Sequence, residues 1–265
     1  MLGQDVVRAA GGDAIGLAHG DLDVTDTSAV RDALGGAKLV INCAAYTDVD
    51  GAEADPAAAD AVNTHGARNV AEAAARVIYV STDYVFDGSK PGAYVESDAT
   101  GPLSEYGRSK LEGERATLTA SPHSLVVRTS WLFGAAGGNF VDTMLRLAEE
   151  RDELRVVDDQ IGCPTFTGHL AEALVTLARG EARLADGHSA HGVLHVAGAG
   201  SCTWFEFART IFESAGIEMH VEPCTTDEFP RPARRPANSV LRSERGAPEL
   251  PSWQEGLDAF LGVRR

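Results

Sequence analysis

Two side chains four residues apart in the sequence offer acid–base chemistry. Tyr106 and Lys110 form a Y-x-x-x-K pattern in segment 106–116, whose apolar residues recur at helical spacing. Residues i and i+4 share one face of a helix, so we expect the ammonium near the phenol. A nearby positive charge lowers a tyrosine pKa from about 10, and such a phenol exchanges a proton near neutral pH. A surface tyrosine on an amphipathic helix would show the same spacing.

Hydroxyl groups close the buried strand that precedes this helix. Ser81, Thr82 and Asp83 directly follow the β-rich segment 77–80. Ligands of doubly wound sheets bind in the crevice at the carboxyl ends of the strands. Either hydroxyl is therefore placed to hold a substrate carbonyl oxygen, and Asp83 is placed to orient the substrate.

Segments of strand and helix type alternate through the first 180 residues. This alternation predicts a doubly wound α/β fold with a parallel sheet and crossover helices. Helices are predicted at 2–10, 28–34, 56–75, 106–116 and 140–150, and strands at 14–19, 38–42, 77–81 and 125–129. A connection between helix and strand usually takes about 2 to 6 residues. Only Arg76 separates helix 56–75 from strand 77–81, so either the helix ends early or residues are missing there.

The composition narrows the class of partner. The 265 residues carry a net charge of −16, which argues against a nucleic-acid-binding surface and favours a small-molecule ligand. Apolar runs are far shorter than the roughly 20 residues of a membrane span. The four cysteines are scattered and no secretory signal precedes them, which predicts a soluble protein with reduced thiols in a cytoplasm.

Several linked motifs resemble the extended short-chain dehydrogenase/reductases, and within them the branch that reduces 4-keto groups of dTDP-activated deoxysugars. The first is Ser-Thr-Asp-Tyr-Val-Phe-Asp-Gly at 81–88, followed by Tyr106 and Lys110. The likeness runs over nearly the whole chain. The other similar stretches, in family order, are 42–50, 128–131, 158–165, 235–239 and 250–261.

The resemblance implies reduction of the 4-keto group of dTDP-4-dehydro-6-deoxy-L-mannose to dTDP-L-rhamnose, with hydride from NADPH or NADH. Tyr106 is then the general acid, Lys110 tunes it and holds the nicotinamide ribose, and Thr82 binds the keto oxygen. The implied cofactor-binding residues are Gly3, Asp23, Val24, Ala44, Ala45, Thr47, Tyr106 and Lys110. The implied fold has a Rossmann-like portion at 1–157 and a mainly substrate-binding portion at 158–265, interleaved in one body. The chain is expected as a monomer or homodimer.

The substrate side is expected to use seven residues. They are Asp83, Tyr84, Trp131, Asn139, Phe140, Gln160 and Arg235. Arg235 is favoured for the diphosphate because a guanidinium binds phosphate oxygens at two points and because it lies in the family-like R-P-x-N-S stretch. The arginine-rich segment 231–245 would also suit a solvated face. Trp131 is expected to stack on the hexose or thymine, and a buried tryptophan at a strand end is the alternative.

Two clusters of possible metal ligands are interpreted as structural. His188, His191 and His195 have metal-like spacing, but His195 lies in a strand-like run and His188 in a turn, so no metal site is predicted. The acidic residues Asp48, Asp50 and Glu53 are interpreted as charge at a helix N-terminus ahead of Pro56.

The beginning of the chain departs from the family pattern. The first strand and the early glycines of the phosphate-binding turn are expected to be absent, with Gly3 as the last glycine of that turn and Met1 internal to the true protein. Loss of this strand would leave a gap in the order 3-2-1-4 and weaken cofactor binding. Two other functions stay open: a 4-ketoreductase for another nucleotide-activated deoxysugar, and a non-catalytic nucleotide-sugar-binding protein.

Overall fold

Four parallel strands form the central sheet of this chain, whose computed structural model describes residues 1–182, 184 and 190–264. The strands are hydrogen-bonded in the order β1-β2-β3-β8, and each neighbouring pair is parallel. Their bounds are Val40–Asn42, Val77–Thr82, Leu125–Thr129 and Gly192–His195. The predicted α/β fold with a parallel sheet is confirmed.

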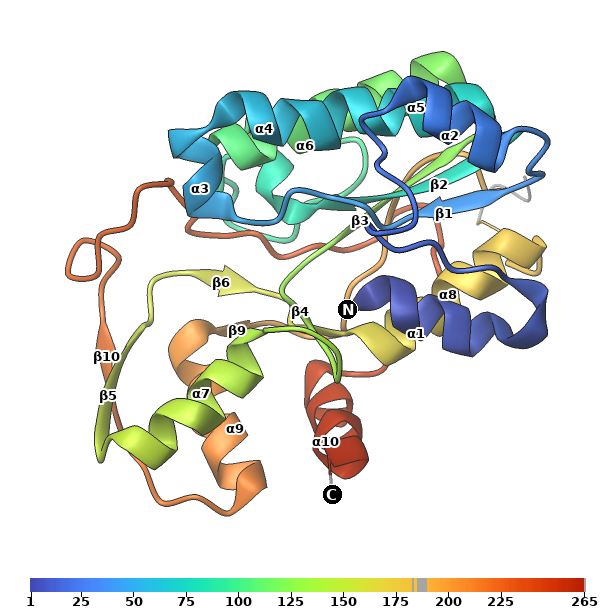
Figure 1. Cartoon of the computed structure of the whole chain (residues 1–265). Coiled ribbons are helices and arrows are strands. Elements are labelled where there is room, and N and C mark those ends of the chain that lie inside the picture. The colour runs from blue at the N-terminus through green and yellow to red at the C-terminus, as the bar shows by residue number, and fades with distance from the viewer. Residues whose placement is uncertain (183, 185–189, 265) are drawn as a thin grey trace.

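Helices cover both faces of this sheet (Figure 1). Successive residues of a strand point to opposite faces. Ile78 and Val80 of β2 therefore pack into one core with α1 and α8, while Val77 and Tyr79 pack into another with α2 and α5. The helices of the first face are α1 (Leu2–Ala10) and α8 (Thr167–Arg179). Those of the second are α2 (Thr27–Leu34), α3 (Val49–Ala54), α4 (Pro56–Asp60), α5 (Ala67–Ala73) and α6 (Glu105–Ala120).

A second group of elements lies below the sheet in Figure 1 and has its own aromatic core. Its helices are α7 (Phe140–Glu150), α9 (Trp204–Ala215) and α10 (Trp253–Arg264). Its strands form three pairs: β4 (Leu132–Phe133) with β7 (Thr165–Phe166), β5 (Glu153–Val157) with β10 (His220–Cys224), and β6 (Ile161–Gly162) with β9 (Cys202–Thr203).

The prediction of a strand at 14–19 is wrong. This segment is irregular, and the side chains of Ile15 and Leu17 are 92% and 48% exposed. An extended segment becomes a strand only when a neighbour satisfies its backbone groups. In the described residues the sheet ends at β1, so segment 14–19 lacks that neighbour. The strands β1, β2, β3 and β8 form one continuous sheet, and segment 14–19 lies outside it. The expected gap at the first strand stays a prediction.

The helix predicted at 56–75 is divided into three pieces. Between α4 and α5 the chain forms a π-helical segment, η2 (Ala61–Gly66). The helical run ends at Ala73, because Ala74 takes an extended conformation. Residues 74–76 then make the connection to β2, so the early end of the helix accounts for the short spacing. Short helical turns also occur at η1 (Gly11–Asp13) and η3 (Asp83–Val85).

No helix among the described residues is long and apolar enough to cross a membrane.

Candidate active site

The two hydroxyls at the end of β2 face different surroundings. The Ser81 hydroxyl donates to Glu114 Oε1 at 2.6 Å, inside the protein. Thr82 is the next residue, so its side chain points to the opposite face. Its hydroxyl donates to Asp83 Oδ1 at 3.1 Å and accepts from the backbone N–H of Tyr84 at 3.2 Å. Of the two residues that the sequence left open, Thr82 is the one beside the tyrosine side chains.

Tyr106 is held near Thr82 by the start of α6. The Ser104 hydroxyl caps this helix by accepting from the backbone N–H of Gly107 at 3.2 Å. A Cβ at Gly107 would lie 2.3 Å from the carbonyl oxygen of Tyr84, so only glycine allows this close approach. The rings of Tyr84 and Tyr106 consequently meet edge to face, with centroids 5.9 Å apart.

The pKa of Tyr106 differs from the sequence prediction. Burial, together with the charge of Asp83, raises the pKa of Tyr106 to about 12, although a hydrogen bond with Thr82 lowers it. The predicted lowering by Lys110 is wrong for this arrangement, because the ammonium is directed elsewhere. The phenol stays protonated across neutral pH, which suits a proton donor.

Lys110 reaches across the helix–sheet interface to β2. Its Nζ donates to the carbonyl oxygen of Val80 at 2.7 Å and lies 4.1 Å from the centre of the Tyr79 ring. Burial lowers the pKa of Lys110 to about 7, while the carboxylate of Glu114 acts in the opposite direction. The ammonium has three N–H groups, and the bond to Val80 uses one of them.

Asp83 is a buried carboxyl beside Thr82. It is 2% exposed, and burial raises the pKa of Asp83 to about 7, with hydrogen bonds from Ser239 and Thr82 limiting the rise. A carboxyl with this pKa is present in both protonation states near neutral pH.

A buried ion pair behind β2 was not foreseen from the sequence. Arg128 contacts Glu114 at two points, with Nε–Oε1 at 2.9 Å and Nη2–Oε2 at 2.7 Å. The side chains are 5% and 3% exposed. Glu114 also binds Ser81, so the pair supports the strand that presents Thr82.

The predicted cofactor residues on the far side of Lys110 are partly brought together. A Cβ at Gly3 would lie 3.7 Å from Cys43 Cβ, which places α1 against the loop after β1. The backbone N–H of Ala44 donates to Asn42 Oδ1 at 3.0 Å, and this turn directs the chain toward Ala45. Ala44 and Ala45 are half-buried. Thr47, in the same loop, is exposed.

The fully buried Asn63, in the π-helical segment, joins this loop to α6. Its side chain accepts from the Tyr46 backbone N–H at 2.9 Å and donates to the Ser109 hydroxyl at 2.9 Å. Asn63 belongs to no motif that the sequence analysis identified, and only its place within the π-helical segment of the structure marks it.

Asp23 and Val24 make local contacts with Thr25 and Gly66. The Asp23 carboxylate accepts from the backbone and hydroxyl of Thr25, and this lowers the pKa of Asp23. Val24 packs against Gly66, where a Cβ would lie 2.7 Å from Val24 Cγ2. Both residues are thereby fixed, while their predicted contact with adenine stays a prediction.

Arg235, which the sequence predicts to bind the diphosphate, is already paired. Its two Nη atoms contact Asp50 at 3.1 and 3.0 Å, and Arg231 binds the same carboxylate. Asp48 and Asp50 were interpreted as charge at a helix N-terminus, and this interpretation is confirmed. Asp48 caps α3 by accepting from the backbone N–H of Gly51 at 2.8 Å, and Asp50 lies in the first turn of the helix. The pairing of Asp50 with the two arginines was not foreseen.

Trp131 stacks on a second tryptophan. Its ring lies parallel to that of Trp204, with centroids 3.5 Å apart, and it crowds Gly162, where a Cβ would lie 2.3 Å from the indole. Trp131 has φ +45°, a conformation that is strained for a large side chain. Phe140 packs against Trp204 with ring centroids 4.6 Å apart, so it joins this aromatic group.

Asn139 and Gln160 make structural contacts. Asn139 caps α7 by accepting from the backbone N–H of Asp142 at 3.1 Å. Gln160 donates to the Thr226 hydroxyl at 2.9 Å and ties two loops together. Their predicted substrate contacts stay predictions.

The histidines do not converge among the described residues. His195 is buried in β8, where its Nδ1 lies 3.1 Å from the carbonyl oxygens of Tyr94 and Arg242. His188 lies outside the described residues. Within the described part, no group of His, Cys, Asp or Glu side chains has the arrangement of a metal site.

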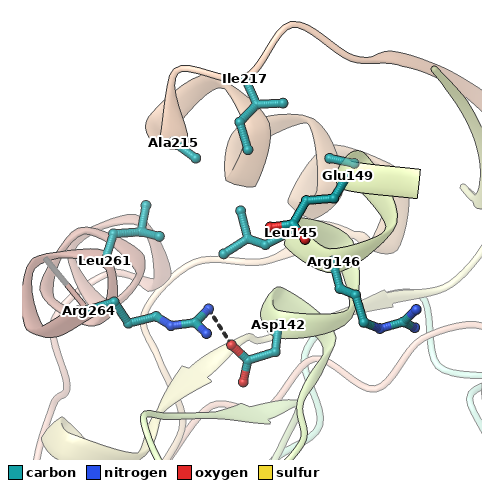
Figure 2. Close-up of a pocket in the computed structure, with 9 residues that line it drawn as sticks. Asp142, Leu145, Arg146, Glu149, Ala215, Ile217, Leu261 and Arg264 are labelled. Carbon is teal, nitrogen blue, oxygen red and sulfur yellow. Dashed lines mark ion pairs between the residues drawn. The ribbon is translucent and has the colours of Figure 1, made fainter. Parts of the chain in front are cut away.

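A cavity of about 660 Å³ lies away from these residues, between α7, the end of α9 and α10 (Figure 2). Leu145, Ile217 and Leu261 line it, and an ion pair between Arg264 and Asp142 at 2.5 Å lies at its side. Its lining includes no residue predicted to bind substrate or cofactor, so this cavity is separate from the candidate active site.

The chain is similar to known proteins over most of its length. A family model described as the RmlD substrate binding domain matches residues 1–264. A dTDP-4-dehydrorhamnose reductase from Sinorhizobium fredii is 46% identical over 87% of this chain and 81% of its own length. The chain belongs to the RmlD family of dTDP-4-dehydrorhamnose reductases. The reductase branch that the motifs resemble is thereby confirmed.

Other RmlD relatives add a solved structure and a second substrate. The crystal structure of dTDP-4-dehydrorhamnose reductase from Bacillus anthracis, in complex with NADP, matches with a TM-score of 0.91 and 38% identity. The match covers 99% of this chain and 95% of that one. A probable dTDP-4,6-dihydroxy-2-methyloxan-3-one 4-ketoreductase from Streptomyces antibioticus is 41% identical over 99% of this RmlD family member and 92% of its own length.

Proposed function

We propose that this protein reduces the 4-keto group of dTDP-4-dehydrorhamnose to give dTDP-L-rhamnose, using NADPH or NADH. The observation that carries this proposal is the joint placement of Thr82, Tyr106 and Lys110 around the end of β2. The similarity to reductases of the RmlD family supports the substrate.

Thr82 binds the keto oxygen of the substrate, and Tyr106 supplies the proton that this oxygen receives. The Thr82 hydroxyl donates a hydrogen bond to the keto oxygen and fixes its direction. Tyr106, protonated at neutral pH, gives its proton to that oxygen as the carbon is reduced. The product is an alcohol, and the tyrosine recovers a proton from solvent.

The residues present fit a nicotinamide cofactor. The ammonium of Lys110 has two N–H groups beyond its bond to Val80 O, which suits ribose hydroxyls. Gly3, Ala44, Ala45 and Thr47 would hold the cofactor along the end of β1, with Asp23 and Val24 near adenine. When bound, NADPH or NADH supplies the hydride that reduces the keto carbon.

The substrate lies, in this proposal, toward the second group of elements. Asp83 and Tyr84 border the reacting sugar, and Trp131 offers an aromatic face beside Trp204. Asn139, Phe140 and Gln160 flank this region, and Arg235 faces the diphosphate. The chain then divides into a doubly wound cofactor portion at 1–157 and a mainly substrate-binding portion at 158–265. The two are interleaved, because β8 and α8 belong to the first body.

A 4-ketoreductase for another dTDP-activated deoxysugar is the second candidate. The observation that favours it is the likeness to the Streptomyces antibioticus protein, at nearly the same identity and greater coverage. The catalytic residues would be the same, because only the sugar substituents differ.

The test supplies purified protein and NADPH with dTDP-4-dehydrorhamnose or with a second 4-keto dTDP-deoxysugar, and follows NADPH consumption and the product. We expect faster turnover of dTDP-4-dehydrorhamnose, with dTDP-L-rhamnose as product. Preference for the other sugar would support the second candidate. Tight binding of dTDP-sugar without NADPH consumption would support a non-catalytic binding protein.

A further inference from the structure

The carboxylate of Asp50 accepts hydrogen bonds from two arginine side chains and one backbone N–H group. It accepts from Arg231 Nε and Nη2 at 3.0 and 2.6 Å, from Arg235 Nη1 and Nη2 at 3.1 and 3.0 Å, and from the backbone N–H of Ala233 at 3.1 Å. Burial would raise the pKa of Asp50, but the bonds from Arg235 and Arg231 outweigh it and hold the pKa far below its usual range. The contact is therefore ionic at any physiological pH.

This contact joins segments that are distant in the sequence. Asp50 is the second residue of α3, while the two arginines belong to the long loop after β10, which passes beside α3 (Figure 1). Asp50 and Arg235 are only 18% and 17% exposed, whereas Arg231 is 50% exposed. Arg235 is accordingly the fixed guanidinium and Arg231 the outer one.

The same loop is also packed against the segment that follows Thr82. A Cβ at Gly88 would lie 2.7 Å from Pro236 and from the backbone nitrogen of Ala237. Arg235 is a hydrogen-bond partner of the Tyr84 hydroxyl, and the Tyr84 ring contacts that of Tyr106. A chain of direct contacts thus runs from Asp50 through Arg235 to the proposed proton donor.

The charges of this cluster favour an anion. Two guanidinium groups share one carboxylate, which leaves one positive charge in a protein of net charge −16. Each guanidinium has five N–H donors. Arg235 uses two of them on Asp50 and one on the carbonyl oxygen of Ala233, and Arg231 uses two on Asp50. The remaining donors suit the oxygens of a diphosphate.

We propose that Asp50 is a positioning residue for the diphosphate of the nucleotide substrate, because it fixes Arg235 beside Tyr84. This inference rests on the proposed function and assigns a role to Asp50 that the motifs did not indicate. A fixed guanidinium loses less side-chain freedom on binding than a free one, so its contribution to affinity is larger.

Asp50→Asn tests this proposal. We expect the KM for the dTDP-sugar and the Kd for dTDP, measured by calorimetry, each to rise about tenfold, as the loss of one charge-assisted contact predicts. The kcat and the Kd for NADPH stay within about twofold. Asp50→Glu, which keeps the charge, restores part of the affinity. Asp48→Asn is the matched control, since Asp48 caps the same helix without touching either arginine.

A second comparison separates positioning from general damage to the fold. In an Arg235→Ala background, Asp50→Asn has little further effect on the Kd for dTDP, because the residue that it positions is gone. Equal effects in both backgrounds would overturn the proposal, as would an unchanged or lower Kd in Asp50→Asn. A wild-type protein that binds dTDP but does not reduce the keto sugar would contradict the proposed function, and the dTDP Kd values would still decide the role of Asp50.

Discussion

Glu114 and Arg128 form a two-point ion pair directly behind the residues that present Thr82. Glu114 also accepts from the Ser81 hydroxyl, and its charge acts on the buried ammonium of Lys110. The Glu114 carboxylate thus connects α6, the strand that ends at Thr82 and the neighbouring strand β3.

Replacing the Glu114 carboxylate should lower the free energy of unfolding by about 3–5 kcal/mol. Glu114→Gln leaves the guanidinium of Arg128 buried without its counter-charge, and removal of one partner of such a pair costs about 3–5 kcal/mol. Glu112→Gln, two residues earlier, is the control, because its pair with Arg115 is 39% and 60% exposed. Such exposed pairs contribute about 0.2–1 kcal/mol. Urea unfolding measures both, and similar losses in the two variants would contradict this view of Glu114.

Lys110→Met should weaken cofactor binding more than folding. The methionine keeps the apolar stem against Tyr79 but loses the N–H groups, so we expect the Kd for NADPH to rise at least about tenfold and turnover to fall. Stability changes little, because burial already disfavours the charged form and lowers the pKa of Lys110 to about 7. Lys38→Met replaces an exposed lysine and should alter neither quantity. A normal NADPH Kd in Lys110→Met would exclude the role in ribose binding.

Asp83 should make stability depend on pH in a defined direction. Its pKa is raised from 3.8 to about 7, so the folded state binds more protons than the unfolded state between these values. Stability therefore falls as pH rises through this window, by an amount of up to about 4 kcal/mol. In Asp83→Asn, the free energy of unfolding, measured with urea at several pH values in this window, should fall less steeply.

The neighbouring Asp87 provides the control for that measurement. Asp87 is exposed, and hydrogen bonds from Ser89 and Tyr94 lower its pKa, which is the opposite shift. Asp87→Asn should therefore leave the decline in place. A decline that persists unchanged in Asp83→Asn would show that another group causes it.

The parts of the fold that local pattern decides were predicted well. The ends of α1 and α7 agree with the sequence prediction, because apolar spacing and, for α7, the Asn139 cap act within a few residues. Segment 14–19 has a strand-like pattern, but strand formation also requires a neighbour, and the sequence of the segment carries no information on that. The helix predicted at 56–75 is interrupted at the π-helical segment that contains Asn63, whose partners Tyr46 and Ser109 are distant in the chain.

The candidate site shows the same limit. Thr82, Tyr106 and Lys110 could be recognised because strand ends and helical spacing determine where they point. The arginine partners of Asp50 were not foreseen, because they lie more than 180 residues away. The pKa of Tyr106 was predicted in the wrong direction, because i, i+4 spacing places Lys110 on the same helix face but does not show that its ammonium binds Val80.

The central claim is that Tyr106 donates the proton in an NADPH-dependent reduction of a 4-keto dTDP-sugar. The most direct measurement is the rate of NADPH consumption with dTDP-4-dehydrorhamnose for wild type and Tyr106→Phe, together with the Kd of each for NADPH. We predict a rate at least about a hundredfold lower in Tyr106→Phe with a Kd within about twofold, since general acid catalysis contributes about 10²–10⁴-fold. A rate that falls less than about tenfold, with normal NADPH binding, would contradict the assignment.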